Sequence, residues 1–291
     1  PMLEDNTTWL LAADFDEENW QLDVAAFCKC CKDMGLAPAV ERSRSGNGAH
    51  VWFFFSAPVA AVDARRLGTS LLTRTMAHRH ELSFSSYDRL FPSQDTVPKG
   101  GFGNLIALPF QGQAQKDGNS LFVDESFVPY PDQWAFLCSL PKITSEQLGE
   151  CLQKLCRNGD MGELTDVAEE QVPWKRKKNR QKLTRGDFPL QATLMASNLI
   201  YIEKKGFSQK ALNALKRLAA FPNPEFRSKQ AMRISVYGIP RVLDCGYEDG
   251  SYIGLPRGCM EILLDMFDQY GVPAVLEDHR FSGHSIDAEF S

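Results

Sequence analysis

Two aspartates, Asp14 and Asp16, stand one residue apart at the end of a short apolar run. In an extended segment the side chains of residues i and i+2 point to the same face, so both carboxylates can bind the same divalent cations. Asp16 is followed by two glutamates, and such a cluster is also typical of a helix N-terminus. The pair therefore indicates either a metal site or an acidic helix start.

A glycine-rich turn follows, with the sequence SGNGAH from Ser45 to His50 and Arg44 just before it. Glycines let backbone N–H groups turn toward an anion, and the hydroxyl of Ser45, the guanidinium of Arg44 and the imidazole of His50 add donors. We expect these residues and Gly48 to contact phosphate. An ordinary Asn-Gly hairpin containing a hydrogen-bonded histidine is the alternative.

Asp88 offers a third carboxylate, and Lys99 opens a second basic, flexible turn, KGGFG. Phosphoryl transfer with two cations needs shared acidic ligands that also neutralise charge on the leaving group. Asp95 competes for this role, but the prolines around it explain it equally well as a turn residue, so Asp88 is favoured.

These residues need strands and helices that bring them together. The patterns predict strands at 9–14, 38–42, 49–55, 104–110 and 120–123, with helices at 17–34, 60–78 and 132–157. The second and third strands form a hairpin around the glycine-rich turn. The mixture predicts an α/β or α+β domain over residues 1–157.

A charged linker over residues 158–187 and a smaller α+β domain over 188–291 are expected next. In the latter the patterns predict helices at 190–203, 208–220 and 257–270 and strands at 234–242 and 251–255. The linker is acidic first and then basic. Its cations either hold nucleic-acid phosphates or form a solvated arm, and the two interpretations stand level. They are Lys175, Arg176, Lys177, Lys178, Arg180, Lys182 and Arg185.

Composition indicates a globular protein, with 43% apolar and 24% charged residues. The net charge of −5 argues weakly against nucleic-acid binding as a general property of the surface. The sequence contains neither an apolar run that could cross a membrane nor a signal peptide, so we expect no membrane partner and a cytoplasmic location. The eight cysteines lack zinc-ribbon spacing and are expected to be reduced thiols.

The order of these motifs resembles the archaeo-eukaryotic primase superfamily. ERSRSGNGAHVW, YDRLFPSQD and KGGFGNLIALPFQ look like the primase-polymerase domain of TOTE conflict systems and their CRISPR-associated relatives. The resemblance covers about residues 5–150. It implies a primase-polymerase core of α+β class with mixed sheets and flanking helices.

The resemblance also implies roles for individual residues. Asp14, Asp16 and Asp88 would be catalytic and would hold two Mg²⁺ or Mn²⁺ ions. Arg44, Ser45, Gly48, His50 and Lys99 would contact a dNTP or NTP substrate. Gln94 and Asn104 match family positions without an assigned role. The implied reaction adds nucleotides to a 3′ end or starts a primer on a DNA template, with RNA as an alternative.

The second unit resembles the segment that precedes a superfamily 2 helicase in the same systems. The stretches that carry this resemblance are LKRLAAFPNPEF, AMRISVYGIPR and YIGLPRGCMEILLDMF. No Gly-x-x-x-x-Gly-Lys-Ser/Thr loop occurs in these 291 residues, and the chain starts at a proline. We expect a fragment of a longer protein that includes a helicase, with Lys175, Arg176, Lys177, Lys178 and Arg180 binding nucleic acid. Two alternatives remain open, a non-catalytic nucleic-acid-binding module and a metal-dependent nuclease.

Overall fold

The computed structural model describes residues 2–98, 101, 103–157 and 183–281. The chain forms two compact units. The first comprises 1–182 together with 221–243, and the second comprises 183–220 together with 244–291. The sequence pattern placed 221–243 in one C-terminal domain with its neighbours, whereas the structure groups this segment with the first unit.

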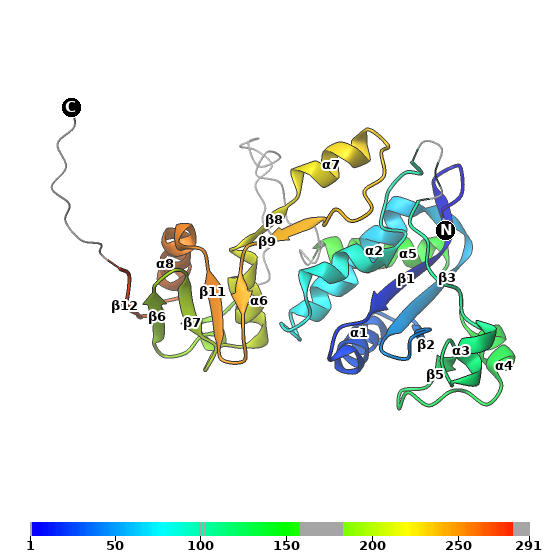
Figure 1. Cartoon of the computed structure of the whole chain (residues 1–291), viewed down its shortest axis with the longest axis horizontal. Helices are drawn as coiled ribbons and strands as arrows, with labels where there is room; N and C mark the ends of the chain where they lie inside the picture. Colours follow the sequence, from blue (N-terminus) through cyan, green and yellow to red (C-terminus); the bar gives the residue numbers. More distant parts are fainter. Residues whose placement is uncertain (1, 99–100, 102, 158–182, 282–291) are drawn as a thin grey trace. The chain divides into compact units, whose positions relative to one another are not determined.

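The first unit is built on a five-stranded sheet in the order β4-β1-β3-β2-β5 (Figure 1). Its strands are β1 (Thr7–Phe15), β2 (Ala39–Arg42), β3 (Ala49–Ala60), β4 (Leu90–Phe91) and β5 (Phe122–Val123). Every neighbouring pair is antiparallel. The expected hairpin around the glycine-rich turn is thus confirmed, as is the α+β class.

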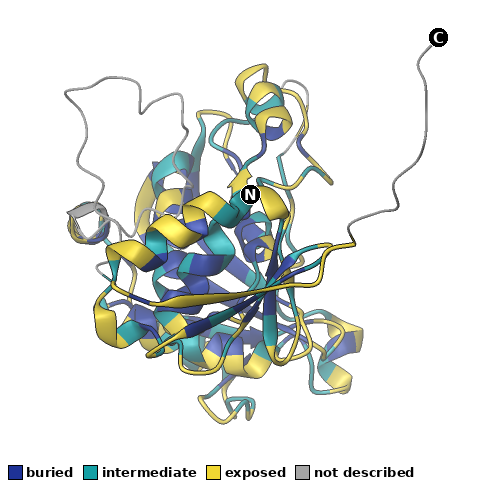
Figure 2. Ribbon diagram, turned by 90° about the vertical axis from the view of Figure 1, so that its left-hand side faces the viewer, coloured by how far each residue is buried: buried dark blue, intermediate teal, exposed yellow. Residues whose placement is uncertain are grey.

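Three helices cover one face of this sheet: α1 (Trp20–Asp33), α2 (Ala61–Met76) and α5 (Ser145–Arg157). Phe27 of α1 packs against Phe15 of β1 and Phe53 of β3, with ring centroids 5.3 and 6.3 Å apart. All three rings are buried. In Figure 2, dark blue marks such buried residues along the strands and the inner faces of the helices.

The opposite face carries a second apolar cluster. Ala12, Ala39, Trp52 and Phe122 are buried there, beneath aromatic and aliphatic residues from the segment that contains α3 (Gly112–Lys116) and α4 (Gln133–Ser139). Because both faces are covered, β1 and β3 are apolar along most of their length instead of alternating with polar residues.

Two details of the first unit differ from expectation. Residues 104–110 do not form a strand; Ile106 and Phe110 pack against the second apolar cluster from an irregular segment. The helix expected over 132–157 is divided into α4 and α5, and Pro141 lies between them, since proline disfavours helix interiors. A short 3-10 helix, η1 (Phe84–Arg89), leads into β4.

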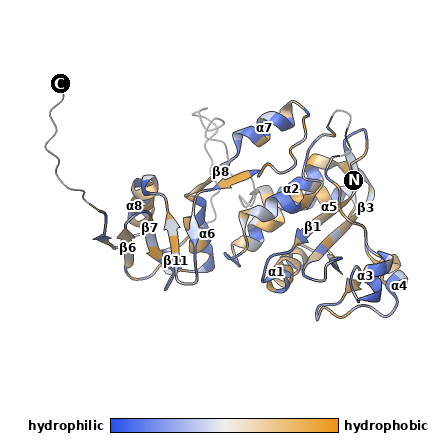
Figure 3. Ribbon diagram, in the orientation of Figure 1, coloured by the Kyte–Doolittle hydropathy of each residue, from blue (hydrophilic) through white to orange (hydrophobic). Residues whose placement is uncertain are grey.

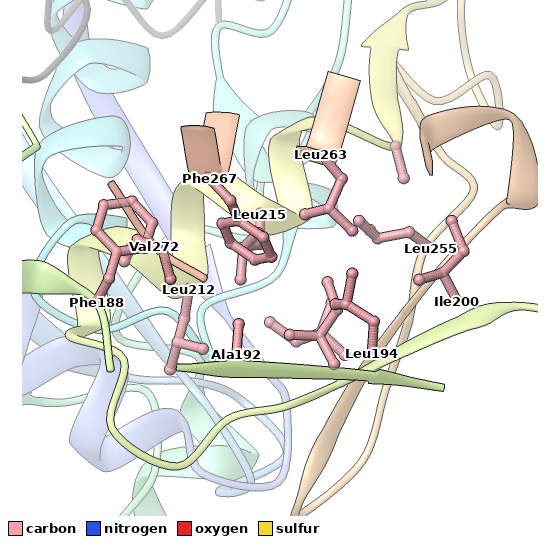
Figure 4. Close-up of a cluster of buried hydrophobic side chains, with 14 residues drawn as sticks. Phe188, Ala192, Leu194, Ile200, Leu212, Leu215, Leu255, Leu263, Phe267 and Val272 are labelled. Carbon is pink, nitrogen blue, oxygen red and sulfur yellow. The ribbon is translucent and has the colours of Figure 1, made fainter. Parts of the chain in front are cut away.

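The second unit has its own five-stranded sheet in the order β10-β11-β7-β6-β12. These strands are β6 (Ala192–Ala196), β7 (Ile200–Glu203), β10 (Tyr247–Glu248), β11 (Tyr252–Leu255) and β12 (Ala274–Asp278). The helices α6 (Gln209–Arg217) and α8 (Met260–Gln269) and two short turns, η3 (Arg185–Asp187) and η4 (Arg257–Cys259), complete it. Figure 4 shows its separate core, which includes Leu194, Leu215 and Phe267.

The helix expected over 190–203 is wrong, because β6 and β7 form a hairpin there. Ala192, Leu194 and Ala196 are buried with a period of two, which is the strand period rather than the helical one. The strand expected over 234–242 is also wrong. Only β9 (Val242–Asp244) forms, and it pairs with β8 (Ala220–Pro222).

Residues 221–243 contain α7 (Pro224–Ala231), which is largely hydrophilic in Figure 3. The guanidinium of Arg241 stacks 4.4 Å from the ring centre of Phe226. The side chain of Asn223 accepts from the N–H of Glu225 and donates to the carbonyl of Pro240, 2.8 Å away. These contacts therefore connect the beginning of residues 221–243 to the end of the same segment.

Two further features bear on function class. Within the described ranges, no helix is both long and apolar enough to span a bilayer. The cysteines whose side chains are described form no disulfide with one another.

The core of the first unit can be tested at Phe27. Phe27→Ala should lower the free energy of unfolding by about 3–5 kcal/mol, since it leaves a cavity between β1, β3 and α1. Chemical denaturation followed by tryptophan fluorescence measures this. Leu22→Ala, on the exposed face of the same helix, should change stability by less than about 0.5 kcal/mol. Equal effects of the two substitutions would contradict the packing described.

Candidate active site

Strand register brings three of the acidic and basic side chains into one row. Asp14 of β1 pairs with His50 of β3, and His50 pairs with Glu41 of β2. The Nε2 atom of His50 lies 3.6 Å from Oδ1 of Asp14, and its Nδ1 lies 3.0 Å from Oε2 of Glu41. The end of β1 and the beginning of β3 thus form one polar site at the edge of the apolar face.

Glu41 was not expected at this site. Its carboxylate is only 1% exposed and accepts hydrogen bonds from Nε1 of Trp52 at 2.8 Å and from the hydroxyl of Ser120 at 3.2 Å. The signal that could have found it is the period of two in β2, because Ala39 and Glu41 are the buried positions of that strand. A charged residue at a buried strand position needs partners.

The carboxylates of Asp14 and Asp16 both contact the positively charged side chain of Arg89. The Nη1 atom of Arg89 lies 2.6 Å from Oδ2 of Asp16 and 3.4 Å from Oδ2 of Asp14. Arg89 is the last residue of η1 and precedes Leu90, which pairs with Ala13, so strand pairing places Arg89 beside Asp14. These three residues line a pocket together with Glu17, Ser85 and Ser86. Sequence reasoning missed Arg89.

The charges of the site act on each other. Burial raises the pKa of Asp14, and the neighbouring Asp16 raises it further, whereas His50 and Arg89 lower it. Burial alone would lower the pKa of Arg89, but Asp16 and Asp14 raise it overall. The guanidinium therefore stays charged. The carboxylate of Asp14 lies where the approach of a positive charge is favourable.

Asp88 is held differently from the other two aspartates. Its Oδ1 accepts the backbone N–H of Arg241 at 2.8 Å, and the guanidinium of Arg241 donates to the carbonyl of Ser93. Burial raises the pKa of Asp88, while the bond from Arg241 lowers it. Asp88 is not among the residues that line the pocket of Asp14 and Asp16.

The expected set of three metal-binding carboxylates is consequently not assembled. Among the described residues, no three His, Cys, Asp or Glu side chains are arranged so that they could hold a metal ion. Asp14 and Asp16 are brought together, whereas Asp88 is engaged by residues 221–243. The competing Asp95 forms an ion pair with the buried Arg65, with a distance of 3.1 Å from Oδ2 to Nη2.

The glycine-rich turn is packed against the end of β1. Gly46 has a φ of +80°, which other residues rarely adopt. A Cβ atom on Gly48 would lie 2.5 Å from the carbonyl oxygen of Phe15 and 3.2 Å from Cα of Asp16. The hydroxyl of Ser45 lies 3.1 Å from that of Ser43, and Arg44 is exposed. The turn therefore stands directly beside Asp16.

Two positions without an assigned role have distinct surroundings. Asn104 accepts from the N–H of Ser93 at 3.1 Å and donates to the carbonyl of Leu90 at 2.9 Å, so it fastens the segment that follows β4. Gln94 is buried, and its Oε1 has no hydrogen-bond partner within the described residues. Lys99 and the basic residues Lys175, Arg176, Lys177, Lys178 and Arg180 lie outside the described residues.

Residues 1–151 match the family model of the archaeo-eukaryotic primase domain of TOTE conflict systems. The match spans more than half of the 291 residues and includes Asp14, Asp16, His50 and Asp88. The chain belongs to the TOTE archaeo-eukaryotic primase family. Residues 1–151 therefore form a primase-type α+β domain, and this family is of the nucleotidyltransferase kind and occurs in conflict systems. A search of curated proteins finds no match.

The close approach at Gly48 yields a test of this TOTE primase domain. Gly48→Ala should lower the free energy of unfolding by about 1–3 kcal/mol, because the added methyl group overlaps the backbone of Phe15. Thermal unfolding measures the change. The control is Gly149→Ala in α5, where an added Cβ has no neighbour within 4 Å. It should stabilise the protein by about 0.5–1 kcal/mol. A neutral Gly48→Ala would contradict the close approach.

Proposed function

We propose that this TOTE primase chain is a template-directed nucleotidyltransferase, a DNA primase or polymerase that adds nucleotides to a 3′ end or starts a primer. One observation carries the proposal. Two adjacent carboxylates, Asp14 and Asp16, share a single cationic nitrogen of Arg89 next to His50 and a glycine-rich turn. Membership of the primase family is the reason to interpret this arrangement as a nucleotidyl-transfer site.

The carboxylates of Asp14 and Asp16 are ligands of the type preferred by Mg²⁺ and Mn²⁺, and such a reaction uses two of these ions. These ions prefer carboxylate oxygens, and the guanidinium of Arg89 occupies a position where one positive charge is held by both Asp14 and Asp16. Bound there, the ions would activate the attacking hydroxyl and neutralise the leaving pyrophosphate. Asp88 is proposed as the third ligand. The Arg241 N–H is donated to its Oδ1, so Oδ2 keeps its capacity to bind a cation.

The triphosphate is proposed to lie along the turn between β2 and β3. His50 directs Nε2 toward the carboxylate pair, and the hydroxyl of Ser45 and the backbone N–H groups around Gly48 add neutral donors. Arg44 and Lys99 supply positive charge. A dNTP or NTP is the corresponding substrate. Positioning by such donors accounts for much of catalysis in phosphoryl transfer.

The proposed partners follow from the same activity. They are a DNA template and primer, with RNA as an alternative, and a helicase in a longer protein. Lys175, Arg176, Lys177, Lys178 and Arg180 are proposed to bind the nucleic-acid backbone, because clustered cations release counterions from phosphates.

Primer extension tests the proposal. The native chain, with primed template, dNTPs and Mn²⁺, should extend the primer. Asp14→Asn and Asp16→Asn should each reduce extension on the order of 100-fold or more, since each removes a charged ligand. Asp63→Asn is a matched control, because Asp63 pairs with Arg66 on the surface of α2. Extension that persists unchanged in both site variants would sink the proposal, as would its absence from the native chain.

Arg89 yields a second, independent test. Arg89→Gln should raise the affinity for Mn²⁺ in the absence of nucleotide by a few-fold, because the guanidinium competes with the metal for the same carboxylates. Half-exposed ion pairs of this kind contribute roughly 0.2–1 kcal/mol. Isothermal titration calorimetry measures the binding. Arg66→Gln, on α2, should leave Mn²⁺ affinity unchanged. Weaker binding in Arg89→Gln would argue against competition at this position.

A further inference from the structure

We infer that Glu41 is a positioning residue, whose buried carboxylate holds the ring of His50 so that Nε2 faces the bound nucleotide. The inference rests on the proposed function, because it assigns His50 to triphosphate binding. It concerns a residue that begins the stretch ERSRSGNGAHVW but that had been given no role of its own.

The burial of Glu41 requires an explanation. A carboxylate that is 1% exposed loses nearly all of its hydration and must be stabilised by donors. It has three: Nδ1 of His50 at 3.0 Å, Nε1 of Trp52 at 2.8 Å and the hydroxyl of Ser120 at 3.2 Å. Oε2 thus binds the two ring nitrogens, whereas Oε1 binds the hydroxyl of Ser120.

The bond to His50 determines which nitrogen carries a proton. An ionised carboxylate only accepts hydrogen bonds, so Nδ1 must be the donor in this contact. Nε2 is then the ring nitrogen on the far side from Glu41, 3.6 Å from Oδ1 of Asp14. A ring turned over would place carbon atoms at these contacts. Glu41 therefore sets the direction of the imidazole, and a ring protonated on both nitrogens donates to Glu41 from Nδ1 and to a phosphate from Nε2.

Trp52 makes this arrangement rigid. Its indole stands edge-on to the imidazole, with ring centres 5.9 Å apart and planes at 90°, and it donates to the same Oε2 as His50. Trp52 is itself buried in the second apolar cluster. The histidine is thus anchored to the core through Glu41, as carboxylates anchor ligand histidines in metal sites. A ring fixed in advance loses less entropy when a ligand binds.

Glu41→Gln tests the inference with little change in size. The neutral amide oxygen is a weaker acceptor for His50 and Trp52 than the charged carboxylate oxygen, so the ring is held less firmly in its direction. We expect the affinity for dTTP with Mn²⁺, measured by isothermal titration calorimetry, to fall at least about tenfold. The control is Ser120→Ala, which removes the donor to Oε1 and the acceptor for the N–H of Gln111 but leaves both contacts of Oε2 in place. It should lower the melting temperature and leave dTTP affinity unchanged.

A double-mutant cycle separates positioning from general support of the fold. In a His50→Ala background, Glu41→Gln should cause no further loss of dTTP affinity, because its effect passes through the imidazole. An equal loss in both backgrounds would overturn the inference. So would unchanged affinity in Glu41→Gln while the native chain binds dTTP, an outcome that leaves the proposed function standing. If the native chain fails to bind dTTP, both proposals fall.

A measurement on the native chain covers the case in which Glu41→Gln does not fold. With ¹⁵N-labelled histidine, the NMR spectrum should show Nδ1 of His50 protonated and coupled to a hydrogen-bonded proton. A spectrum in which Nδ1 of His50 carries no proton would overturn the inference without any variant.

Discussion

The antiparallel pairing of β1 with β3 is the constraint on which the candidate site depends. It sets Asp14 opposite His50, and the continuation into β2 sets His50 opposite Glu41. Side chains alternate between the faces of a sheet, so a slip of one residue would turn Asp14 into the helix-covered core. Phe15 and Phe53 prevent that slip, because each must reach Phe27 on the other face. Apolar packing on one face of the sheet therefore determines which polar side chains lie next to each other on the opposite face.

Charge balance is the second condition. The carboxylates of Asp14, Asp16 and Glu41 would repel each other without other partners. Arg89 contacts both Asp14 and Asp16, and His50 lies between Asp14 and Glu41. The pKa of Asp14 is nevertheless raised, chiefly by burial. The contacts with His50 and Arg89 thus offset only part of the cost of burying the charged form of Asp14.

The sequence predicted the parts of this site that are contiguous in the chain. Asp14 lies in β1, Asp16 directly follows that strand, and Ser45 to His50 run from the turn into β3, so spacing and order reveal them. Glu41 and Arg89 were missed because their roles arise only from strand register, which local patterns do not determine. The helix wrongly expected over 190–203 has a related cause. Short apolar segments are compatible with both the helical period of 3.6 and the strand period of two. Pairing with a neighbouring strand determines which structure forms.

The environment of Asp88 depends on a segment that is distant in the sequence. The N–H that it accepts comes from Arg241, 153 residues further along the chain and beyond the matched residues 1–151. The donor is the main chain, but the positive charge of the Arg241 side chain also lowers the pKa of Asp88. Contacts of that side chain with the carbonyl of Ser93 and the face of Phe226 hold the segment there. A primase domain trimmed to residues 1–151 would lack the N–H of residue 241, which favours the charged form of Asp88. The environment of Asp88, the carboxylate proposed as the third metal ligand, therefore depends on residues 221–243 as well as on the matched region.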